Sequence, residues 1–271
     1  GKLQNSETIC QGKNIGRSNE TSPEVQCTKM ALSQIKKKID QLYQLKEEFV
    51  KVTEQVPAKQ QMGEPRGISA EYLKSWRPML AQSLHDQKRP PAFESGVWCQ
   101  AKKDGVRNIS ALVDGKVVHQ SRNGKRNTNV SYLDESISSF LDQHPGLILD
   151  GELFKPNIDF SLLVGASKKA NNSVQLEYHV YDCYDSNHPE ATLQQRFLNR
   201  FEGITEIGLV KVVPTFKVHS QEEVVAKHAE FVAAGDEGLM IKTPNSSYDC
   251  GKRSKGLLKV KHFCSEEDWK I

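Results

Sequence analysis

The sequence predicts an α+β fold built on antiparallel sheets, and three observations support this prediction. Short runs of apolar and β-branched residues appear from Trp76 onward, with the length and composition of strands. Polar stretches with helical periodicity lie between these runs, but strands and helices do not alternate regularly, as they would in a parallel sheet. Asp104-Gly105 lies between two of the runs and predicts a tight turn of the kind that joins antiparallel strands.

Residues 1–75 differ in character from the rest of the chain. The opening residues are polar and predict an extended arm. Ser22-Pro23-Glu24 is typical of a helix start, and the apolar spacing that follows predicts one long amphipathic helix through Val52. Residues 53–75 contain several Pro and Gly residues and predict a linker with little regular structure. We therefore expect an N-terminal helical extension followed by a domain over residues 76–271.

Within this domain the same patterns predict the individual elements in chain order. Each predicted strand is a short apolar or β-branched run, and each predicted helix is a longer stretch with helical spacing. The predicted strands are 97–101, 107–113, 116–121, 147–149, 175–182, 209–215 and 257–260, and the predicted helices are 132–143, 192–201 and 221–234.

Composition excludes several classes of protein. No run approaches the roughly 18 apolar residues of a membrane-spanning helix. The six cysteines form no C-x-x-C pair, which argues against a zinc knuckle or a disulfide framework and favours an intracellular protein, bacterial, phage or nuclear. The net charge of +3 is too small to predict nucleic-acid binding, but clustering matters more. Lys252-Arg253-Ser254-Lys255 predicts a basic surface that suits a phosphate backbone.

Several short motifs place chemically active side chains beside predicted strands. The stretch after Gln100 puts a lysine at a strand end, directly before the first Asp-Gly turn. A second Asp-Gly pair, at Asp150-Gly151, predicts another turn after an apolar strand. Lys259 and Lys261 are two residues apart, so they share one face of a strand while Leu258 and Val260 face the core.

Together these motifs resemble the nucleotidyltransferase core of ATP-dependent DNA ligases, which is ATP-grasp-like, in a superfamily that includes mRNA capping guanylyltransferases. The resemblance covers roughly residues 78–271, and a weaker match near Gly12 resembles bacteriophage ligases. The matching motifs are K-x-D-G-x-R (Lys102, Asp104, Gly105, Arg107), Ser121-Arg122-Asn123-Gly124, Asp150-Gly151-Glu152, Tyr181-Asp182, Glu237-Gly238 and Lys259-x-Lys261.

The resemblance implies a nucleophile and a charged surrounding for it. Lys102 would attack the α-phosphate of ATP and form a covalent lysyl-AMP. A free lysine amine is protonated at neutral pH and is then a poor nucleophile. Lys259, Lys261 and a Mg²⁺ ion would disfavour the positive charge on Lys102, and they would also neutralise the negative charge of the phosphates. Glu237 would be the metal ligand, since a hard carboxylate suits magnesium.

The resemblance also implies the nucleotide contacts. Arg107 and Glu152 would bind the ribose hydroxyls, and Arg122 would contact a phosphate. Gln100 would contact the amino edge of the base. Tyr181 would stack on adenine, although Tyr178 and His179, in the same predicted strand, compete for that role. These two alternatives stay open from the sequence alone.

The function that the resemblance implies is that of a DNA ligase adenylation domain. AMP would pass from Lys102 to the 5′-phosphate of nicked duplex DNA, and the 3′-OH would then seal the nick. We expect a monomer that uses ATP and Mg²⁺, with no membrane association. The alternatives are an RNA ligase, a GTP-dependent capping enzyme, or a nucleic-acid-binding relative without activity. Family members continue into an OB-fold domain, and Asp268–Ile271 resembles its first strand, so we expect that domain to be absent here.

Overall fold

The computed structural model describes residues 22–23, 67–87, 89, 91–168 and 174–261. The predicted N-terminal arm, nearly all of the predicted long helix and most of the predicted linker lie outside the described residues. The C-terminal strand predicted at Asp268–Ile271 lies outside them as well. Residues 63–271 form one compact unit, and all the elements below belong to it.

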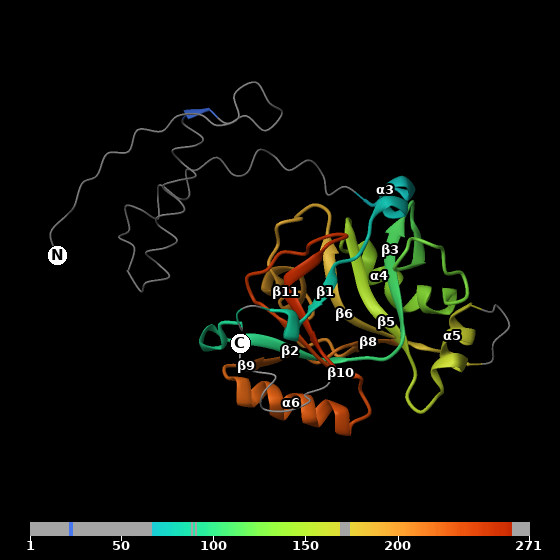
Figure 1. Cartoon of the computed structure of the whole chain (residues 1–271). Coiled ribbons are helices and arrows are strands. Elements are labelled where there is room, and N and C mark those ends of the chain that lie inside the picture. The colour runs from blue at the N-terminus through green and yellow to red at the C-terminus, as the bar shows by residue number, and fades with distance from the viewer. Residues whose placement is uncertain (1–21, 24–66, 88, 90, 169–173, 262–271) are drawn as a thin grey trace. The chain divides into compact units, whose positions relative to one another are not determined.

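Two sheets make up this unit (Figure 1), and most of their neighbouring strands are antiparallel. Only β1–β11 and β6–β8 pair in parallel among the described strands. The predicted α+β class with antiparallel sheets is therefore confirmed. The five-stranded sheet has the order β1 (Leu80–Ser83), β11 (Arg253–Val260), β10 (Gly238–Lys242), β2 (Val97–Lys102), β9 (Phe216–Val218). The six-stranded sheet has the order β4 (Lys116–Ser121), β3 (Val106–Val113), β5 (Leu147–Phe154), β6 (Glu177–Asp185), β8 (Val210–Val212), β7 (Glu206–Ile207).

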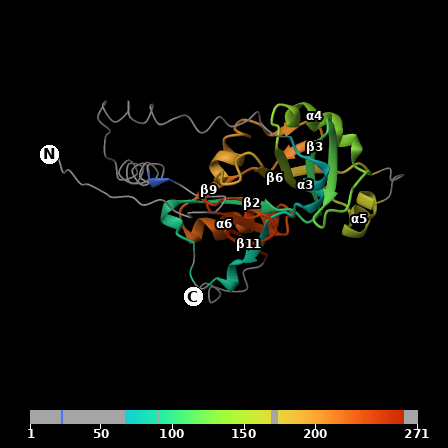
Figure 2. The same ribbon diagram turned by 90° about the horizontal axis from the view of Figure 1, so that it is seen from above.

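Helices cover the outer faces of the two sheets. Helix α6 (Gln221–Ala233) lies along β10 and β2, as Figures 1 and 2 show, and its N-terminus is capped by the Ser220 hydroxyl. Helix α4 (Asp134–Asp142) packs on β3 and β4, and α5 (Phe160–Lys168) contacts β3 and contributes to the same core cluster as α4. None of the helices in the described part of the chain is long and apolar enough to cross a bilayer.

Most of the predicted elements are present. The predicted strands at 97–101, 107–113 and 116–121 are confirmed as β2, β3 and β4. The predicted helices at 132–143 and 221–234 are confirmed as α4 and α6. These elements share strong local periodicity, which is the signal that a sequence carries most directly.

Three predictions were wrong in extent or type. The predicted strand 147–149 continues through Phe154 as β5, and the predicted strand 209–215 is reduced to β8. The predicted helix at 192–201 contains only a π-helical turn, Gln194–Leu198. Helix α5 was not predicted, because its sequence is apolar all along rather than periodic.

The linker prediction was wrong for its last residues. Residues 70–75 form helix α3 (Ala70–Ser75), and the Ser69 side chain caps its first turn. Leu73 and the following Trp76 are almost fully buried, with 1% and 5% of their surface exposed. The hydrophobic burial of these two side chains fixes the segment to the domain.

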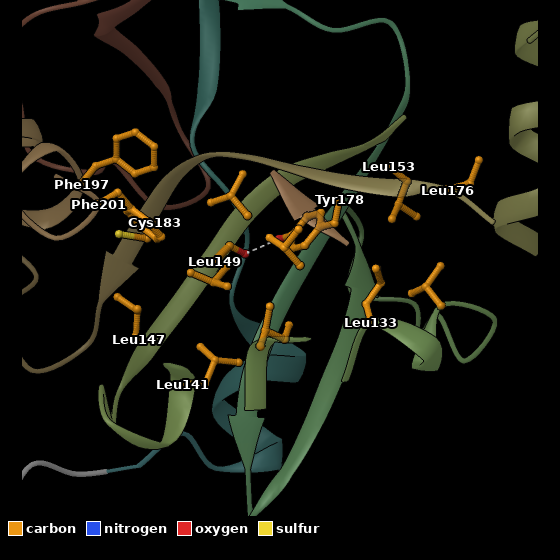
Figure 3. Packing of buried hydrophobic residues seen from close by; sticks show 14 of the residues in the cluster. Leu133, Leu141, Leu147, Leu149, Leu153, Leu176, Tyr178, Cys183, Phe197 and Phe201 are labelled. Carbon is orange, nitrogen blue, oxygen red and sulfur yellow. Dashed lines mark hydrogen bonds between the residues drawn. The ribbon is translucent and has the colours of Figure 1, made fainter. Parts of the chain in front are cut away.

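The largest core cluster lies on the α4 side of the six-stranded sheet. Figure 3 shows its leucines from β5 around Tyr178 of β6, with Leu133 and Leu141 facing them from the α4 region. Tyr178 is fully buried, and its hydroxyl lies 3.1 Å from the carbonyl oxygen of Leu149. A separate cluster fills the space between α6 and the five-stranded sheet, and it includes Val260.

We expect Val260→Ala to lower the free energy of unfolding by about 1–3 kcal/mol, because Val260 is fully buried and its removal leaves a cavity. Chemical denaturation of the purified variant would measure this loss. The matched control is Val232→Ala on α6, where the side chain is 46% exposed and the change should be small. Equal losses for the two variants would contradict the assigned core.

Candidate active site

A pocket of about 300 Å³ is lined by residues from both sheets. It receives side chains from β2, β10 and β11 of one sheet and from β3, β5 and β6 of the other. The structure brings most of the predicted site residues together on its walls: Gln100, Lys102, Arg107, Arg122, Glu152, Tyr181 and Lys259. Glu237 and Lys261 lie beside the pocket and reach it through Lys102.

Strand pairing places Glu237 next to Lys102. The antiparallel register of β10 and β2 sets Gly238 opposite Lys102, and the Glu237 amide donates to the Lys102 carbonyl oxygen at 2.9 Å. The Glu237 carboxylate accepts from the Nζ atoms of both Lys102 and Lys261. Burial alone would raise the pKa of Glu237, but these two ammonium groups outweigh it and lower that pKa.

Strand β11 has the predicted alternation. Leu258 and Val260 are buried in the core beneath α6, with 3% and 0% of their surface exposed. Lys259 points to the other side and lines the pocket, and Lys261 reaches Glu237 just beyond the strand end. The two lysines therefore approach the Lys102 amine from the same face of the sheet.

A buried ion pair forms the pocket wall on the other sheet. Arg107 donates to both carboxylate oxygens of Asp150, from Nε at 2.8 Å and from Nη2 at 2.5 Å. The Tyr248 hydroxyl also donates to Asp150, at 2.5 Å. Burial would lower the pKa of Arg107, but the Asp150 carboxylate more than compensates and raises it well above its usual value. The Asp150 carboxylate thus accepts from both Arg107 and Tyr248, and these hydrogen bonds compensate for its burial.

The predicted turn at Asp150-Gly151 is wrong, because both residues lie inside the continuous strand β5. Gly151 instead allows β6 to pack closely against β5 at this point. A Cβ atom there would lie 2.5 Å from the carbonyl oxygen of His179 and 2.6 Å from the Tyr178 ring. Gly105, by contrast, does lie in the predicted turn between β2 and β3, where a Cβ would lie 2.3 Å from the Leu153 carbonyl oxygen.

A β-bulge in β6 lies at Tyr181. Asp182 pairs with Asp150 and Val180 pairs with Gly151, so Tyr181 is an extra residue in β6 with no partner in β5. Its ring lines the pocket, and the Arg107 guanidinium lies 5.8 Å from the ring centroid. Burial raises the pKa of the Tyr181 hydroxyl well above its ordinary value.

The two other candidates for the base platform point elsewhere. Tyr178 is fully buried, and its hydroxyl lies 3.0 Å from the Asn108 carbonyl oxygen. His179 bonds to Glu177 at 2.8 Å and packs edge-on against Phe154. Neither residue lines the pocket, so the structure leaves Tyr181 as the aromatic of this strand that faces it.

Lys242 is a pocket residue to which the sequence analysis gave no role. Its Nζ donates to the Tyr181 carbonyl oxygen and to Asp182, and its side chain is only 4% exposed. Arg196 makes two further bonds to Asp182, at 2.8 and 3.0 Å. Burial would raise the pKa of Asp182, but Arg196 and Lys242 lower it to about 2. The sequence signal for Lys242 is a lysine at the end of an apolar run, Gly238–Lys242, which forms the buried strand β10.

Gln100 presents a buried acceptor to the pocket. Its Nε2 donates to the Tyr181 carbonyl oxygen at 3.1 Å and to the Thr215 hydroxyl at 2.8 Å. Because a carbonyl oxygen can only accept, this contact fixes the orientation of the amide. The Oε1 atom is buried and has no hydrogen-bond partner among the described residues. A buried acceptor of this kind favours a ligand donor in the pocket.

Glu152 and Arg122 complete the pocket lining. Glu152 lies opposite Arg107 in the β5–β3 pairing, and burial raises its pKa to about 8, with Arg107 acting in the opposite direction. Arg122 lies in the turn after β4, as predicted, and is exposed at the edge of the pocket. Gly124 lets this turn approach Arg77, since a Cβ there would lie 2.7 Å from the Arg77 guanidinium.

The comparisons with known protein families and sequences agree on one family. A sequence model described as the ATP dependent DNA ligase domain matches residues 78–261. The DNA ligase of African swine fever virus, isolate Pretoriuskop, is 24% identical over 96% of this chain and 58% of its own length. The DNA ligase of Archaeoglobus fulgidus is 31% identical over 68% of this chain and 35% of its own length.

Solved structures share the fold. The Chlorella virus DNA ligase-adenylate superposes with a TM-score of 0.51 at 23% identity, covering 68% of each chain. The bacteriophage T7 ATP-dependent DNA ligase, in complex with ATP, gives a TM-score of 0.51 at 20% identity, again over 68% of each chain. The present chain spans about three fifths of the length of the viral relatives that it matches. On the basis of the family match over most of its folded unit, the chain belongs to the ATP-dependent DNA ligase adenylation-domain family.

Proposed function

We propose that the chain adenylylates itself on Lys102 with ATP and passes the AMP to the 5′-phosphate of nicked DNA. The observation that carries this proposal is the position of the Lys102 amine. It lies at the pocket wall and is hydrogen-bonded to Glu237, with Lys259 on the same wall and Lys261 on the same carboxylate. An amine, a carboxylate and two further cations beside one pocket suit an attack on a phosphate.

The first step forms a bond between Lys102 Nζ and the α-phosphorus, while the bond from that phosphorus to the pyrophosphate oxygen breaks. The Lys102 ammonium first gives one proton along its hydrogen bond to Glu237, which frees the lone pair that attacks. The nitrogen loses a second proton to solvent as the phosphoramidate forms. Pyrophosphate leaves with the electron pair of the broken bond. Lys259 and Lys261 lower the energy of the negative charge that builds on the phosphate oxygens.

The pocket suits adenine better than guanine. Gln100 Oε1 is a buried acceptor with no hydrogen-bond partner among the described residues. The amino group of adenine is a donor that would satisfy it. Guanine has an oxygen acceptor in place of that amino group, which would leave Oε1 unpaired. This difference supports ATP over GTP and disfavours a capping guanylyltransferase.

The remaining pocket residues take the other parts of the nucleotide. The Tyr181 ring lines the pocket and would stack on the base. Glu152 and Arg107 lie opposite each other in the β5–β3 pairing and would bind the ribose hydroxyls. Arg122 and Lys259 also line the pocket and would contact the phosphates. An inactive nucleic-acid-binding relative is less well supported, because this complete set of side chains surrounds one pocket. The choice of DNA over RNA rests on the family.

The residues present fit a magnesium ion held mainly by its substrate. The described residues contain no group of three or more His, Cys, Asp or Glu side chains that could hold a metal. Magnesium commonly binds one or two carboxylates and takes its other ligands from phosphates and water. Glu237 is the carboxylate nearest to Lys102 and would supply that protein ligand. Bound there, magnesium would neutralise the phosphate charge and compete with Lys102 for the carboxylate.

We also propose nicked duplex DNA as the macromolecular partner, a monomeric state and an intracellular location. We further propose that the chain divides into an N-terminal region, residues 1–75, and an adenylation domain, residues 76–271. The chain spans 58% of the length of the viral relative, and nick sealing is proposed for the whole protein. Adenylylation and AMP transfer are the steps proposed for this chain.

Lys102→Ala should abolish the covalent adduct formed with radiolabelled ATP and magnesium, because no other amine replaces the nucleophile. Labelled GTP should give no more than a trace of adduct with the unaltered protein. Lys103→Ala is the matched control, since Lys103 pairs with Asp236 at 2.7 Å, and it should keep most of the yield. Adduct on Lys102→Ala, or equal labelling by GTP, would contradict the assignment.

Glu237→Ala should reduce the rate of adduct formation by on the order of 100-fold and shift the magnesium dependence to higher concentration. Glu237→Asp should be milder, because the carboxylate remains but is displaced by about one bond length. Magnesium titrations of single-turnover adenylylation would measure both effects. Unchanged titrations for the two variants would remove Glu237 from the metal role.

Glu152→Gln should stabilise the protein more at pH 9 than at pH 5. The folded-state pKa of Glu152 is raised to about 8, so the native protein keeps a proton that the unfolded chain releases above its ordinary pKa of 4.5. The group therefore lowers stability progressively as the pH rises from about 4.5 to 8, by on the order of a few kcal/mol in total. The amide removes this loss, which thermal melts across the pH range would show.

The control for this prediction is Glu135→Gln, at an exposed position on α4. Its stability difference from the unaltered protein should stay nearly constant over the same pH range. A flat difference for Glu152→Gln as well would mean that its carboxyl group is solvated rather than buried.

A further inference from the structure

The aromatic ring of Tyr248 is buried next to the nucleotide pocket without lining it. Tyr248 lies in the loop between β10 and β11, and only 4% of its surface is exposed. Its ring stacks on that of Trp76, with 5.7 Å between the centroids and 24° between the planes, and it also lies 5.7 Å from the ring of Tyr184. The Arg196 guanidinium lies 5.5 Å from its centroid. These neighbours fix the ring and therefore the place of its hydroxyl.

Backbone hydrogen bonds join the Tyr248 loop to the segment before β1. The Gly251 amide donates to the Arg77 carbonyl oxygen at 2.8 Å. Two residues further along that segment, the Met79 amide donates to the Tyr248 hydroxyl oxygen at 3.2 Å. The hydroxyl therefore replaces a backbone acceptor where the loop and the segment meet.

Four hydrogen bonds close a ring through this hydroxyl. The hydroxyl accepts from the Met79 amide and donates to Asp150 Oδ2 at 2.5 Å. Asp150 accepts from Arg107, and Arg107 Nη2 donates in turn to the Met79 carbonyl oxygen at 2.8 Å. Burial and the Asp150 charge raise the pKa of Tyr248 well above its ordinary value, so the hydroxyl keeps its proton and remains a donor. Each group in the ring thus has a fixed donor or acceptor role.

Arg107 is the donor through which this ring reaches a ligand. It lines the pocket with 17% of its side chain exposed. Its Nε and Nη2 atoms make all of its bonds to Asp150 and Met79. The Nη1 atom has no hydrogen-bond partner among the described residues, so its two N–H groups are available to a molecule in the pocket.

We propose that Tyr248 is a positioning residue for the recognition of ribose. Its hydroxyl acts on Arg107 from two sides, through the Asp150 carboxylate and through the Met79 backbone. Without the hydroxyl, the Met79 amide loses its acceptor and Asp150 loses a donor, so both anchors of the guanidinium are loosened. Arg107 Nη1 then meets the ribose hydroxyls less precisely. The inference rests on the proposed function, because it takes Arg107 as a ribose contact.

A role in stability alone is the competing explanation for the buried hydroxyl. A variant that is merely less stable loses labelling with every nucleotide to the same extent. Misplacement of Arg107 instead weakens only the nucleotides that carry ribose hydroxyls. A nucleotide without these hydroxyls therefore separates the two explanations.

The test compares ATP with 2′,3′-dideoxy-ATP in single-turnover adenylylation with magnesium, below the melting temperature of every variant. Tyr248→Phe should raise the ATP concentration that gives the half-maximal rate by about tenfold, the size expected when one hydrogen bond to a charged group is lost. The corresponding concentration of 2′,3′-dideoxy-ATP should stay nearly unchanged, and the maximal rate with ATP should fall much less.

The matched control is Tyr184→Phe, which removes a hydroxyl from the same aromatic cluster. That hydroxyl bonds to the Tyr72 hydroxyl at 3.3 Å and has no contact with the ring of hydrogen bonds around Asp150. Tyr184→Phe should leave the half-maximal concentrations of both nucleotides unchanged.

Equal losses of Tyr248→Phe with the two nucleotides, no loss with ATP, or the same ATP-specific loss in Tyr184→Phe would overturn the proposal. If the unaltered protein used ATP and 2′,3′-dideoxy-ATP equally well, the ribose assignment of Arg107 would be wrong and this inference with it. Failure of the proposed function is separate, because it would appear as the absence of an ATP adduct on the unaltered protein.

Discussion

The buried Asp150 carboxylate is the contact on which the relative position of the two sheets depends. Within the six-stranded sheet it bonds to Arg107 on the adjacent strand. Arg107 in turn donates to the Met79 carbonyl oxygen, just before β1, and Tyr248 links Asp150 to the Met79 amide. This carboxylate therefore links β3 of the six-stranded sheet to the segments before β1 and before β11 of the five-stranded sheet. Removing it would leave Arg107 charged and unpaired in the interior.

The parts of the site that the sequence could predict depend on short-range spacing. Lys102 lies two residues before Asp104, and the Lys259 and Lys261 side chains alternate with Leu258 and Val260 along a strand. Such relations follow from local geometry alone, so the structure has them as predicted. The strands and helices with clear periodicity were predictable for the same reason.

The parts that could not be predicted depend on contacts between distant segments. Asp150-Gly151 has the composition of a turn, but the glycine is needed for close approach to His179 on the neighbouring strand. Lys242 acquires its role only when β10 lies beside β2 and reaches Asp182. Tyr178 and Tyr181 are three residues apart and so face opposite sides of β6, but which side faces the pocket depends on how β6 packs against distant segments.

The bulge at Tyr181 also has a consequence for how members of this family can diverge. Because Tyr181 is the one extra residue between the pairs Val180–Gly151 and Asp182–Asp150, loss of its codon alone would restore a regular ladder. Such an in-frame deletion would keep the pairing of β5 and β6 in register and remove the Tyr181 ring from the pocket wall. The aromatic lining of the pocket is therefore separable from the strand pairing, whereas loss of the Asp150 carboxylate would leave Arg107 without its ion-pair partner.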